Sequence, residues 1–126
     1  MNMNDGQFQE SFCPKFHKSV ELIGRRWTGA ILRALLSGET RFSDIAHAIP
    51  GLSDRLLSER LKELEAEGVV SRVVYPETPV RIEYHLTEKG QDLSKVVQAI
   101  SDWSARWACQ ELSDIEEIDV ALISAN

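Results

Sequence analysis

The sequence predicts a mainly α-helical domain with a small β-wing, and three observations support this fold class. Two segments with helical spacing of apolar residues lie on either side of Pro50, as two helices joined by a tight turn would. Residues 69–75 and 81–86 are rich in β-branched and aromatic residues, which is typical of two antiparallel strands. Pro76 and Pro79 lie between the two strands, at the tip of the hairpin, where no backbone N–H has to donate a hydrogen bond to a neighbouring strand. This order of elements is a winged helix-turn-helix, which presents one helix to the DNA major groove.

Two helices are expected before the helix-turn-helix. Pro14 suits the first turn of a helix, because its missing N–H costs nothing there, and this helix should end at Gly24. A second helix is expected from about residue 27 to residue 36, with Gly38 as its stop. Residues 40–42 are predicted to form a very short strand.

The helix that would face DNA is the best defined element of the sequence. Ser43 is a candidate N-cap for the first helix of the pair, and Ser53 for the second. At about 100° per residue, Leu57, Leu61 and Leu64 share one stripe of the second helix and are expected to face the core. The side chains on the opposite face need not pack and are free to form hydrogen bonds: Arg55, Ser58, Glu59 and Lys62.

The C-terminal part is predicted to contain one long helix, capped by Thr87. Its apolar residues recur at helical spacing: Leu93, Val96, Val97, Ile100, Trp103 and Trp107. That is more apolar surface than a helix at the end of a small domain usually has to cover. After this helix, Ser113 and Glu116 have the spacing of a capping box and predict a final helical segment.

The charge distribution permits DNA binding without adding support for it. The net charge of the chain is −6. Residues 91–126 hold seven acidic and two basic residues, and residues 1–12 hold two acidic ones, so residues 13–90 have a net charge of +1. Because phosphate contacts supply most of the non-specific affinity for DNA, we expect moderate affinity that dimerisation strengthens.

Composition and spacing exclude several classes of protein. Hydrophobic residues make up 43% of the chain and charged residues 27%, an ordinary globular balance, and no apolar run reaches the roughly 18 residues of a membrane span. The polar N-terminal segment does not resemble a signal peptide, so a cytoplasmic protein is expected. Cys13 and Cys109 do not make a disulfide scaffold, and His17, His47 and His85 are too widely spaced for a zinc site. No nucleophile is paired with a base, so we expect no catalytic site, no metal and no cofactor.

Three stretches of the chain resemble a known family. They are CPKFHKSVELIGRRWTGAILRALLSGETRFSDI, IPGLSDRLLSERLKELEAEGVV and YPETPVRIEYHLTEKG. They contain a cysteine-proline start, a Gly-x-x-Trp junction, an Arg-Phe-Ser step from strand to helix and a Tyr-Pro wing. In these features residues 13–108 are similar to HxlR-type winged-helix transcriptional regulators, which are related to the broader MarR group. Residues 1–12 are then expected to be a polar tail, and residues 109–126 an acidic helical extension.

The resemblance implies a homodimer whose N-terminal and C-terminal helices form the interface. Two recognition helices would then enter successive major grooves of a palindromic operator in double-stranded DNA. The residues expected at the dimer interface are Phe16, Val20, Leu93, Val97, Ile100, Trp103 and Trp107. For Trp103 and Trp107, the alternative is that they line a pocket for a small-molecule effector of unknown identity.

The residues expected to contact DNA lie on the recognition helix and near the wing. Arg55 is the expected base-edge contact, because a guanidinium can bind guanine O6 and N7 together. Ser53 and Lys62 are expected to bind phosphates and set the register. Glu59 stands where many relatives have glutamine, and its carboxylate would accept a hydrogen bond from cytosine N4 while repelling phosphate. The whole candidate set is Ser53, Asp54, Arg55, Ser58, Glu59, Lys62, Arg41 and Arg81.

For some of these residues, the alternative to a DNA contact is an ion pair within the protein itself. Arg55 and Glu59 are spaced for an i,i+4 ion pair on a solvated helix face. Arg81, just after the wing tip, is placed either to reach a minor groove or a phosphate, or to pair with Glu77 or Glu83 on the wing itself.

Cys13 is a candidate sensor of thiol-reactive or redox signals. It stands just before Pro14, at an N-cap position where the positive end of a helix favours the thiolate, and Lys15 is nearby in the sequence. The resemblance implies this role, because several relatives respond to thiol-reactive electrophiles through the matching cysteine. The alternative is a small, half-buried hydrophobic residue. Cys109 would be a resolving partner only if the dimer brings it near.

The sequence leaves two functions from different classes. The leading one is a dimeric, sequence-specific DNA-binding transcriptional regulator. The other is a winged-helix protein-interaction module that never binds DNA, which the near-neutral charge of residues 13–90 and the acidic ends keep open. The salt dependence of binding separates the two, because only phosphate contacts make it steep.

Overall fold

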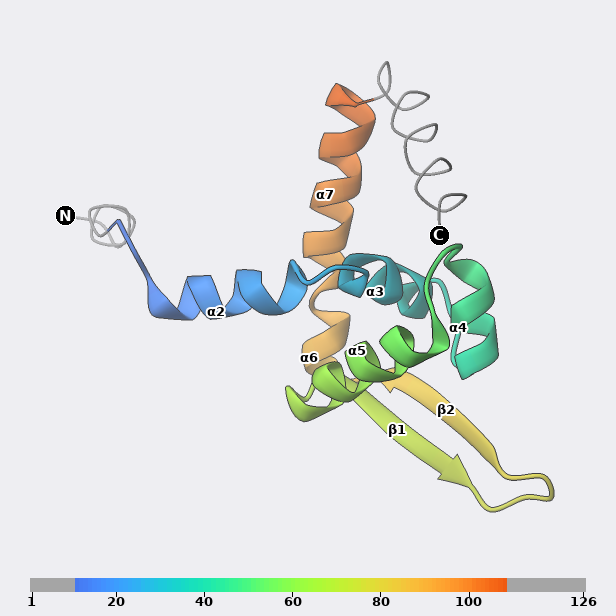
Figure 1. Cartoon of the computed structure of the whole chain (residues 1–126). Helices are drawn as coiled ribbons and strands as arrows, with labels where there is room; N and C mark the ends of the chain where they lie inside the picture. The colour runs from blue at the N-terminus through green and yellow to red at the C-terminus, as the bar shows by residue number, and fades with distance from the viewer. Residues whose placement is uncertain (1–10, 109–126) are drawn as a thin grey trace.

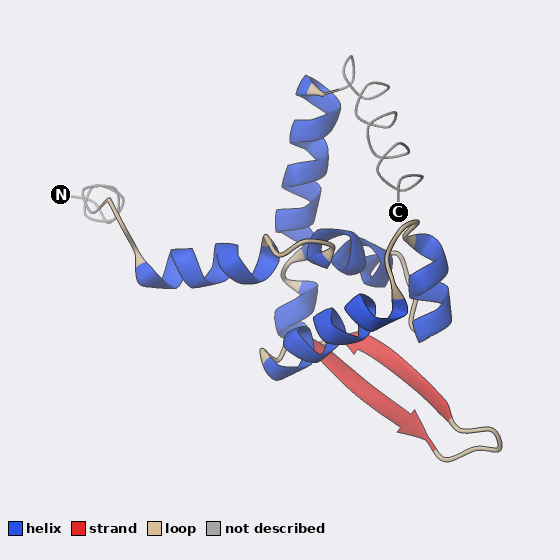
Figure 2. Cartoon of the chain, viewed as in Figure 1, coloured by secondary structure: helices blue, strands red, loops and turns tan. Residues whose placement is uncertain are grey.

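The computed structural model describes residues 11–108 and confirms the predicted winged helix-turn-helix (Figures 1 and 2). Two helices, α2 and α7, extend away from a body formed by the other elements (Figure 1). The elements in chain order are α2 (Pro14–Ile23), α3 (Thr28–Leu36), α4 (Phe42–Ala48), α5 (Asp54–Ala66), β1 (Val70–Tyr75), β2 (Arg81–Leu86), α6 (Glu88–Gln91) and α7 (Ser94–Trp107).

The core lies between α3, α4, α5 and the beginning of the wing. Ile31 of α3 and Ile45 of α4 are fully buried and belong to one apolar cluster with α5. The predicted leucine stripe is confirmed, since Leu57, Leu61 and Leu64 have no more than 1% of their surface exposed. Burial of each such side chain contributes roughly 1.5–3 kcal/mol to stability. The opposite face of α5 is thereby held toward solvent.

The wing is attached to the beginning of α4. β1 and β2 form an antiparallel pair. The strand predicted at residues 40–42 is present only as a single bridge between Arg41 and Glu83, beside a hydrogen bond of 2.8 Å from the Tyr84 nitrogen to the Thr40 oxygen. These contacts fix the position of the wing relative to the helix-turn-helix.

The predicted N-cap of α4 is wrong. This helix begins at Phe42, with Arg41 at the N-cap position, so Ser43 lies inside the first turn. The bridge from Arg41 to Glu83 holds the chain extended up to residue 41, and the helix starts directly after it. The capping pattern depends on neighbouring residues alone, so it does not reveal the contact between Arg41 and Glu83 in the second wing strand.

The predicted long helix after the wing is interrupted. Thr87 does act as an N-cap, since its hydroxyl accepts a hydrogen bond from the Gly90 nitrogen at 3.1 Å, but the helix that it caps is the short α6. The next helix, α7, begins at Ser94. The backbone of α6 is pressed against the wing, because a Cβ atom on Gly90 would collide with the Val69 carbonyl oxygen. Periodicity does not show this packing.

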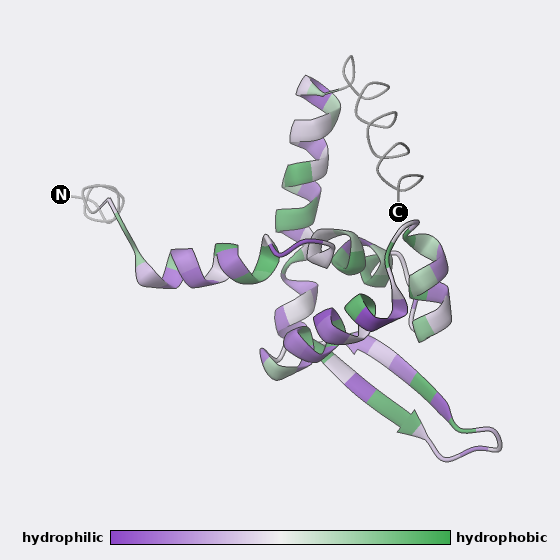
Figure 3. Cartoon of the chain, viewed as in Figure 1, coloured by the Kyte–Doolittle hydropathy of each residue, from purple (hydrophilic) through white to green (hydrophobic). Residues whose placement is uncertain are grey.

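The two projecting helices leave apolar side chains outside the core, and Figure 3 shows apolar bands on both of them. No residue of α2 or α7 is buried. The large hydrophobic residues that they expose are Phe16, Val20, Val96, Ile100, Trp103 and Trp107. The predicted final helix, with Ser113 and Glu116, lies outside the described residues, as does Cys109.

Candidate nucleic-acid interface

The beginning of the recognition helix α5 is fixed by the predicted cap. The Ser53 hydroxyl accepts a hydrogen bond from the Leu56 nitrogen at 3.1 Å. Asp54 adds a carboxylate to the first turn, where the helix dipole favours negative charge. Ser53 and Asp54 are both exposed, so this end of α5 is ordered by its own contacts and open to a partner.

The face of α5 opposite the leucine stripe is open to solvent. Arg55 has 90% of its side-chain surface exposed, and Glu59 has 49%. Lys62 is also exposed, and Ser58 is partly exposed. The structure therefore brings the four predicted side chains to one accessible face that spans about two helical turns.

Arg55 and Glu59 form the ion pair that their spacing predicted. Arg55 Nε lies 3.4 Å from Glu59 Oε1. An ion pair between exposed side chains contributes only about 0–1 kcal/mol, because water and salt screen it. The pair is therefore easily exchanged for contacts to a duplex, and it does not remove Arg55 from the candidate interface.

Arg81 is engaged within the wing. Its Nη2 atom lies 3.2 Å from Glu77 Oε1, and its Nε atom lies 3.4 Å from Glu83 Oε2. The guanidinium also stacks over the Tyr75 ring, 4.2 Å from the ring centroid. Both of the local partners considered from the sequence are present. Arg81 therefore stabilises the wing tip in this structure, and a DNA contact requires it to exchange these partners.

Arg41 is more accessible to solvent than Arg81. It is exposed, and together with Ser43 and Pro79 it lines a hollow of about 510 Å³ between the beginning of α4 and the wing tip. Its position at the edge of the helix-turn-helix is suited to a backbone phosphate contact.

Cys13 is accessible at the end of a projecting helix. It occupies the N-cap position of α2 in an extended conformation, and it is exposed. The described chain therefore does not show the half-buried environment that was the alternative for this cysteine. An exposed sulfur at the beginning of a projecting helix is open to reagents from solution.

The predicted interface residues divide into two groups. Phe16 on α2 is 65% exposed, and on α7 Trp103 is 64% and Trp107 61% exposed. Leu93 and Val97 instead pack partly against the core of their own subunit. The rest of the set, Val20 and Ile100, is exposed like the aromatic residues. The exposed group leaves apolar surface open to solvent on both α2 and α7.

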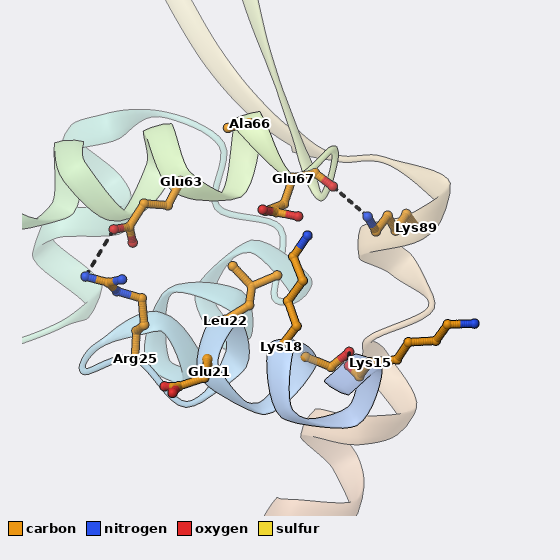
Figure 4. A pocket seen from close by; sticks show the side chains of 10 residues that line it. Lys15, Lys18, Glu21, Leu22, Arg25, Glu63, Ala66, Glu67 and Lys89 are labelled. Atoms are coloured by element: carbon orange, nitrogen blue, oxygen red, sulfur yellow. Dashed lines mark hydrogen bonds and ion pairs between the residues drawn. The ribbon is translucent and has the colours of Figure 1, made fainter. Parts of the chain in front are cut away.

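The sequence analysis did not predict the polar contacts that Arg60 and Glu63 make on another side of α5. Arg60 Nε donates a hydrogen bond of 2.9 Å to the Arg26 carbonyl oxygen. Glu63 Oε2 lies 3.3 Å from Arg25 Nη2 (Figure 4). The i,i+3 spacing of Arg60 and Glu63 was the available signal, and it does not indicate that their partners lie in the turn between α2 and α3.

Beside these polar contacts is a pocket of about 570 Å³ between α2, α5 and α6 (Figure 4). Leu22 and Ala66 contribute apolar surface to it, whereas Lys15 and Lys18 bring ammonium groups from α2. Lys89 donates a hydrogen bond of 2.7 Å to the Glu67 carbonyl oxygen at its rim. The pocket mixes positive and negative groups and is open to solvent.

Among residues 11–108 no group of three or more histidine, cysteine, aspartate or glutamate residues is arranged to hold a metal ion. None of the helices described is both long enough and apolar enough to cross a lipid bilayer.

Comparison with known proteins identifies relatives along most of the chain. Residues 22–112 match the HxlR-like helix-turn-helix family. The chain is 54% identical over 99 residues to the uncharacterized HTH-type transcriptional regulator YvaP of Bacillus subtilis, covering 79% of this chain and 92% of that protein. It is 46% identical over 94 residues to the HTH-type transcriptional regulator YodB of Bacillus subtilis, covering 75% of this chain and 84% of that protein.

Solved structures agree with these sequence relationships. The reduced form of YodB from B. subtilis superimposes with a TM-score of 0.69 at 43% identity, covering 79% of this chain and 97% of that chain. The oxidized form of the redox regulator HypR superimposes with a TM-score of 0.69 at 34% identity, covering 75% of this chain and 96% of that chain. Sequence, fold and relatives agree: the chain belongs to the HxlR-like helix-turn-helix family of transcriptional regulators, and not to a family of enzymes.

Proposed function

We propose that this protein is a cytoplasmic, sequence-specific DNA-binding regulator that acts as a homodimer on a palindromic operator. The observation that carries the proposal is the accessible polar face of α5, held outward by the buried stripe of Leu57, Leu61 and Leu64. A helix presented in this way beside a wing is the arrangement that enters a DNA major groove.

The residues of the interface have different roles in this proposal. Arg55 reads a guanine edge, and Glu59 accepts from a cytosine amino group. Ser53 and Lys62 bind phosphates and set the register. Asp54 and Ser58 complete the face of α5, and Arg41 adds a phosphate contact beside the wing. Arg81 joins the interface only where DNA displaces its carboxylate partners.

The exposed apolar surfaces of α2 and α7 support the dimer. Phe16 and Val20 on α2, and Ile100, Trp103 and Trp107 on α7, each have at least half of their surface exposed. Burying such aromatic and aliphatic side chains against a second copy of the chain removes them from water and places the two α5 helices in one assembly. Leu93 and Val97 support this surface from beneath, because they pack α7 onto the core.

Cys13 is proposed as the group through which the regulator senses thiol-reactive signals. It is exposed at the N-cap of α2, and relatives include YodB, solved in reduced and diamide-treated forms, and the redox regulator HypR. In the proposed reaction, the thiolate sulfur adds to an electron-poor double bond and forms a carbon–sulfur bond. The proton released by the thiol ends on the electrophile. A bulky adduct at the beginning of α2 then alters the dimer.

Fluorescence anisotropy tests DNA binding directly. The full chain is titrated with duplex DNA from its own upstream region and with a scrambled duplex at several salt concentrations. We expect tight binding to the first duplex, and a logarithmic slope against salt of about −0.9 for each phosphate contacted. If no duplex binds, or if binding does not depend on salt, the alternative of a winged-helix protein-interaction module is favoured instead.

The sensing proposal has its own test. Treatment with N-ethylmaleimide is expected to weaken operator binding by the wild type, but not by Cys13→Ser, which retains Cys109. Equal loss of binding in the two proteins would assign the response to a different group. Mapping bound DNA fragments across the genome, with and without diamide, then identifies the target genes and shows whether the response occurs in cells.

A further inference from the structure

Side chains of the recognition helix contact the turn between α2 and α3, and the most buried of them is Arg60. The Arg60 side chain is only 11% exposed and leaves α5 away from the predicted DNA-reading face. Its Nε atom donates a hydrogen bond of 2.9 Å to the carbonyl oxygen of Arg26. The contact joins a side chain of α5 to the backbone of the segment that leads out of α2.

A carboxylate on the next turn of α5 strengthens this attachment. Glu63 lies 3.3 Å from Arg60 Nη1 through Oε1, and 3.3 Å from Arg25 Nη2 through Oε2. Figure 4 shows Arg25 and Glu63 reaching toward each other between the two segments. We call the group of Arg25, the Arg26 carbonyl, Arg60 and Glu63 the α5 clamp. The hydrogen bond between Arg60 and Glu63 is charge-assisted, and such bonds fix orientation because their geometry is specific. The contact of Arg25 with Glu63 adds a partly exposed ion pair.

The turn that the clamp holds has an unusual backbone conformation. Trp27 has a φ of +78°, in the left-handed region that bulky residues rarely adopt. Such a conformation persists only where surrounding contacts determine it. Here the Arg60 hydrogen bond fixes the preceding residue, the Trp27 ring packs against the core, and the Thr28 nitrogen donates to the Arg25 oxygen at 3.0 Å. The turn therefore has one defined geometry.

Little else determines the direction of α2. No residue of this helix is buried, and Leu22, near its C-terminal end, is the α2 residue that packs partly against the core. In Figure 1 the remainder of α2 extends away from the body. The angle between α2 and α5 is thus set at the end of α2 where the clamp lies.

We propose that Arg60 and Glu63 are positioning residues for operator recognition. They set the angle between the dimerisation helix α2 and the recognition helix α5, and so the separation of the two recognition helices in the dimer. This inference rests on the proposed function. The ten residues of α2 span about 15 Å. A rotation of about 10° at the clamp displaces the far end by about 2.6 Å, close to the 3.4 Å rise of one base pair.

The test compares operators that differ in half-site spacing. The wild-type protein first selects its operator from random-sequence duplex DNA, and duplexes are then made with one base pair removed or added between the half-sites. Dissociation constants are measured for the wild type, Glu63→Gln and Arg60→Lys. Glu65→Gln is the matched control, because it removes the same charge from an exposed position of the same helix.

We expect wild type and Glu65→Gln to prefer the selected spacing by at least about tenfold, since recognition helices in such dimers are held about one helical turn apart. In Glu63→Gln and Arg60→Lys this preference should fall to about twofold. The affinity of these two variants for a single half-site should change no more than that of Glu65→Gln, because the outward face of α5 is the same in all of them. A general loss of folded protein lowers affinity for every duplex equally and leaves the preference unchanged.

A double-mutant cycle on the same duplexes completes the test. Arg25→Gln and Glu63→Gln should have non-additive effects on the spacing preference, because the two side chains contact each other. If Glu63→Gln and Arg60→Lys keep the wild-type preference, the clamp does not position the recognition helices. If the wild type selects no operator at all, it is instead the proposed function that fails.

Discussion

At the scale of single residues, contacts within one helix were predictable and contacts between distant segments were not. The Ser53 cap and the leucine stripe depend on spacings of three or four residues, which the sequence displays directly. The hydrogen bond from Arg60 to Arg26 joins residues 34 positions apart. For Arg81, the sequence supplied the partners Glu77 and Glu83 but not the choice between them and DNA, because that choice depends on how the wing tip folds.

Arg55→Ala tests the proposed base-edge contact. Loss of a bidentate contact to guanine should cost about 1–3 kcal/mol on the selected operator and relax the preference at one base pair. The exposed ion pair with Glu59 contributes little to folding, so the free energy of unfolding should be nearly unchanged. The measurement is anisotropy on operators mutated one base pair at a time. Lys62→Ala is the comparison, since loss of a phosphate contact weakens binding to all sequences alike.

Glu59→Gln separates sequence selection from affinity. The amide no longer repels phosphate, so binding to random duplex DNA should become tighter. A glutamine amide also pairs with adenine, so the preference for cytosine at the contacted position should weaken. Selection from random-sequence DNA by both proteins measures the change. An unchanged preferred sequence would show that Glu59 does not read a base.

At the scale of elements, the order of helices and strands was predictable, while their ends depended on packing. The wing strands and α5 have strong patterns of their own, and both are present as expected. The beginning of α4 depends on the bridge from Arg41 to Glu83, and α6 packs against the wing through the close approach of Gly90 to Val69. Helix periodicity contains no information about such contacts.

Gly90→Ala tests the close packing of α6 on the wing. Alanine normally stabilises a helix relative to glycine, by up to about 1 kcal/mol. Here the added Cβ atom would collide with the Val69 carbonyl oxygen, so we expect destabilisation by about 1–3 kcal/mol. Gly29→Ala in α3 is the control, because a Cβ atom there meets nothing within 4 Å and should stabilise the fold. Urea denaturation of both variants measures the two free energies, and stabilisation by Gly90→Ala would contradict the packing.

At the scale of the whole molecule, the described chain places its polar reading face and its apolar faces on different elements. α5 and the wing carry the groups proposed to contact DNA, whereas α2 and α7 carry the apolar surface proposed to contact a second copy. The sequence showed the excess of apolar residues on α7, but it did not show that Leu93 and Val97 face the core while Trp103 and Trp107 do not. This division arises because α7 packs on the core only near its beginning and then extends away from the body (Figure 1).

The dimer is best tested by a substitution on the exposed part of α7. Deleting residues 91–126 would also remove Leu93 and Val97 from the core, so a loss of DNA binding would not distinguish a monomer from a destabilised fold. Trp103→Glu places a charge in the proposed interface and leaves the core intact. An aromatic anchor contributes about 2 kcal/mol in each protomer, so the dimer dissociation constant should rise by about 10³-fold.

Ala105→Glu is the matched control, because it adds the same charge to the opposite face of α7, where the side chain is exposed. Sedimentation of the three proteins measures the association. On a two-half-site operator, Trp103→Glu should lose affinity while keeping wild-type affinity for one half-site, since both α5 helices then bind independently. If Trp103→Glu sediments as a dimer like Ala105→Glu, the apolar face of α7 lies outside the interface, and the pairing of two recognition helices must be achieved by other surfaces.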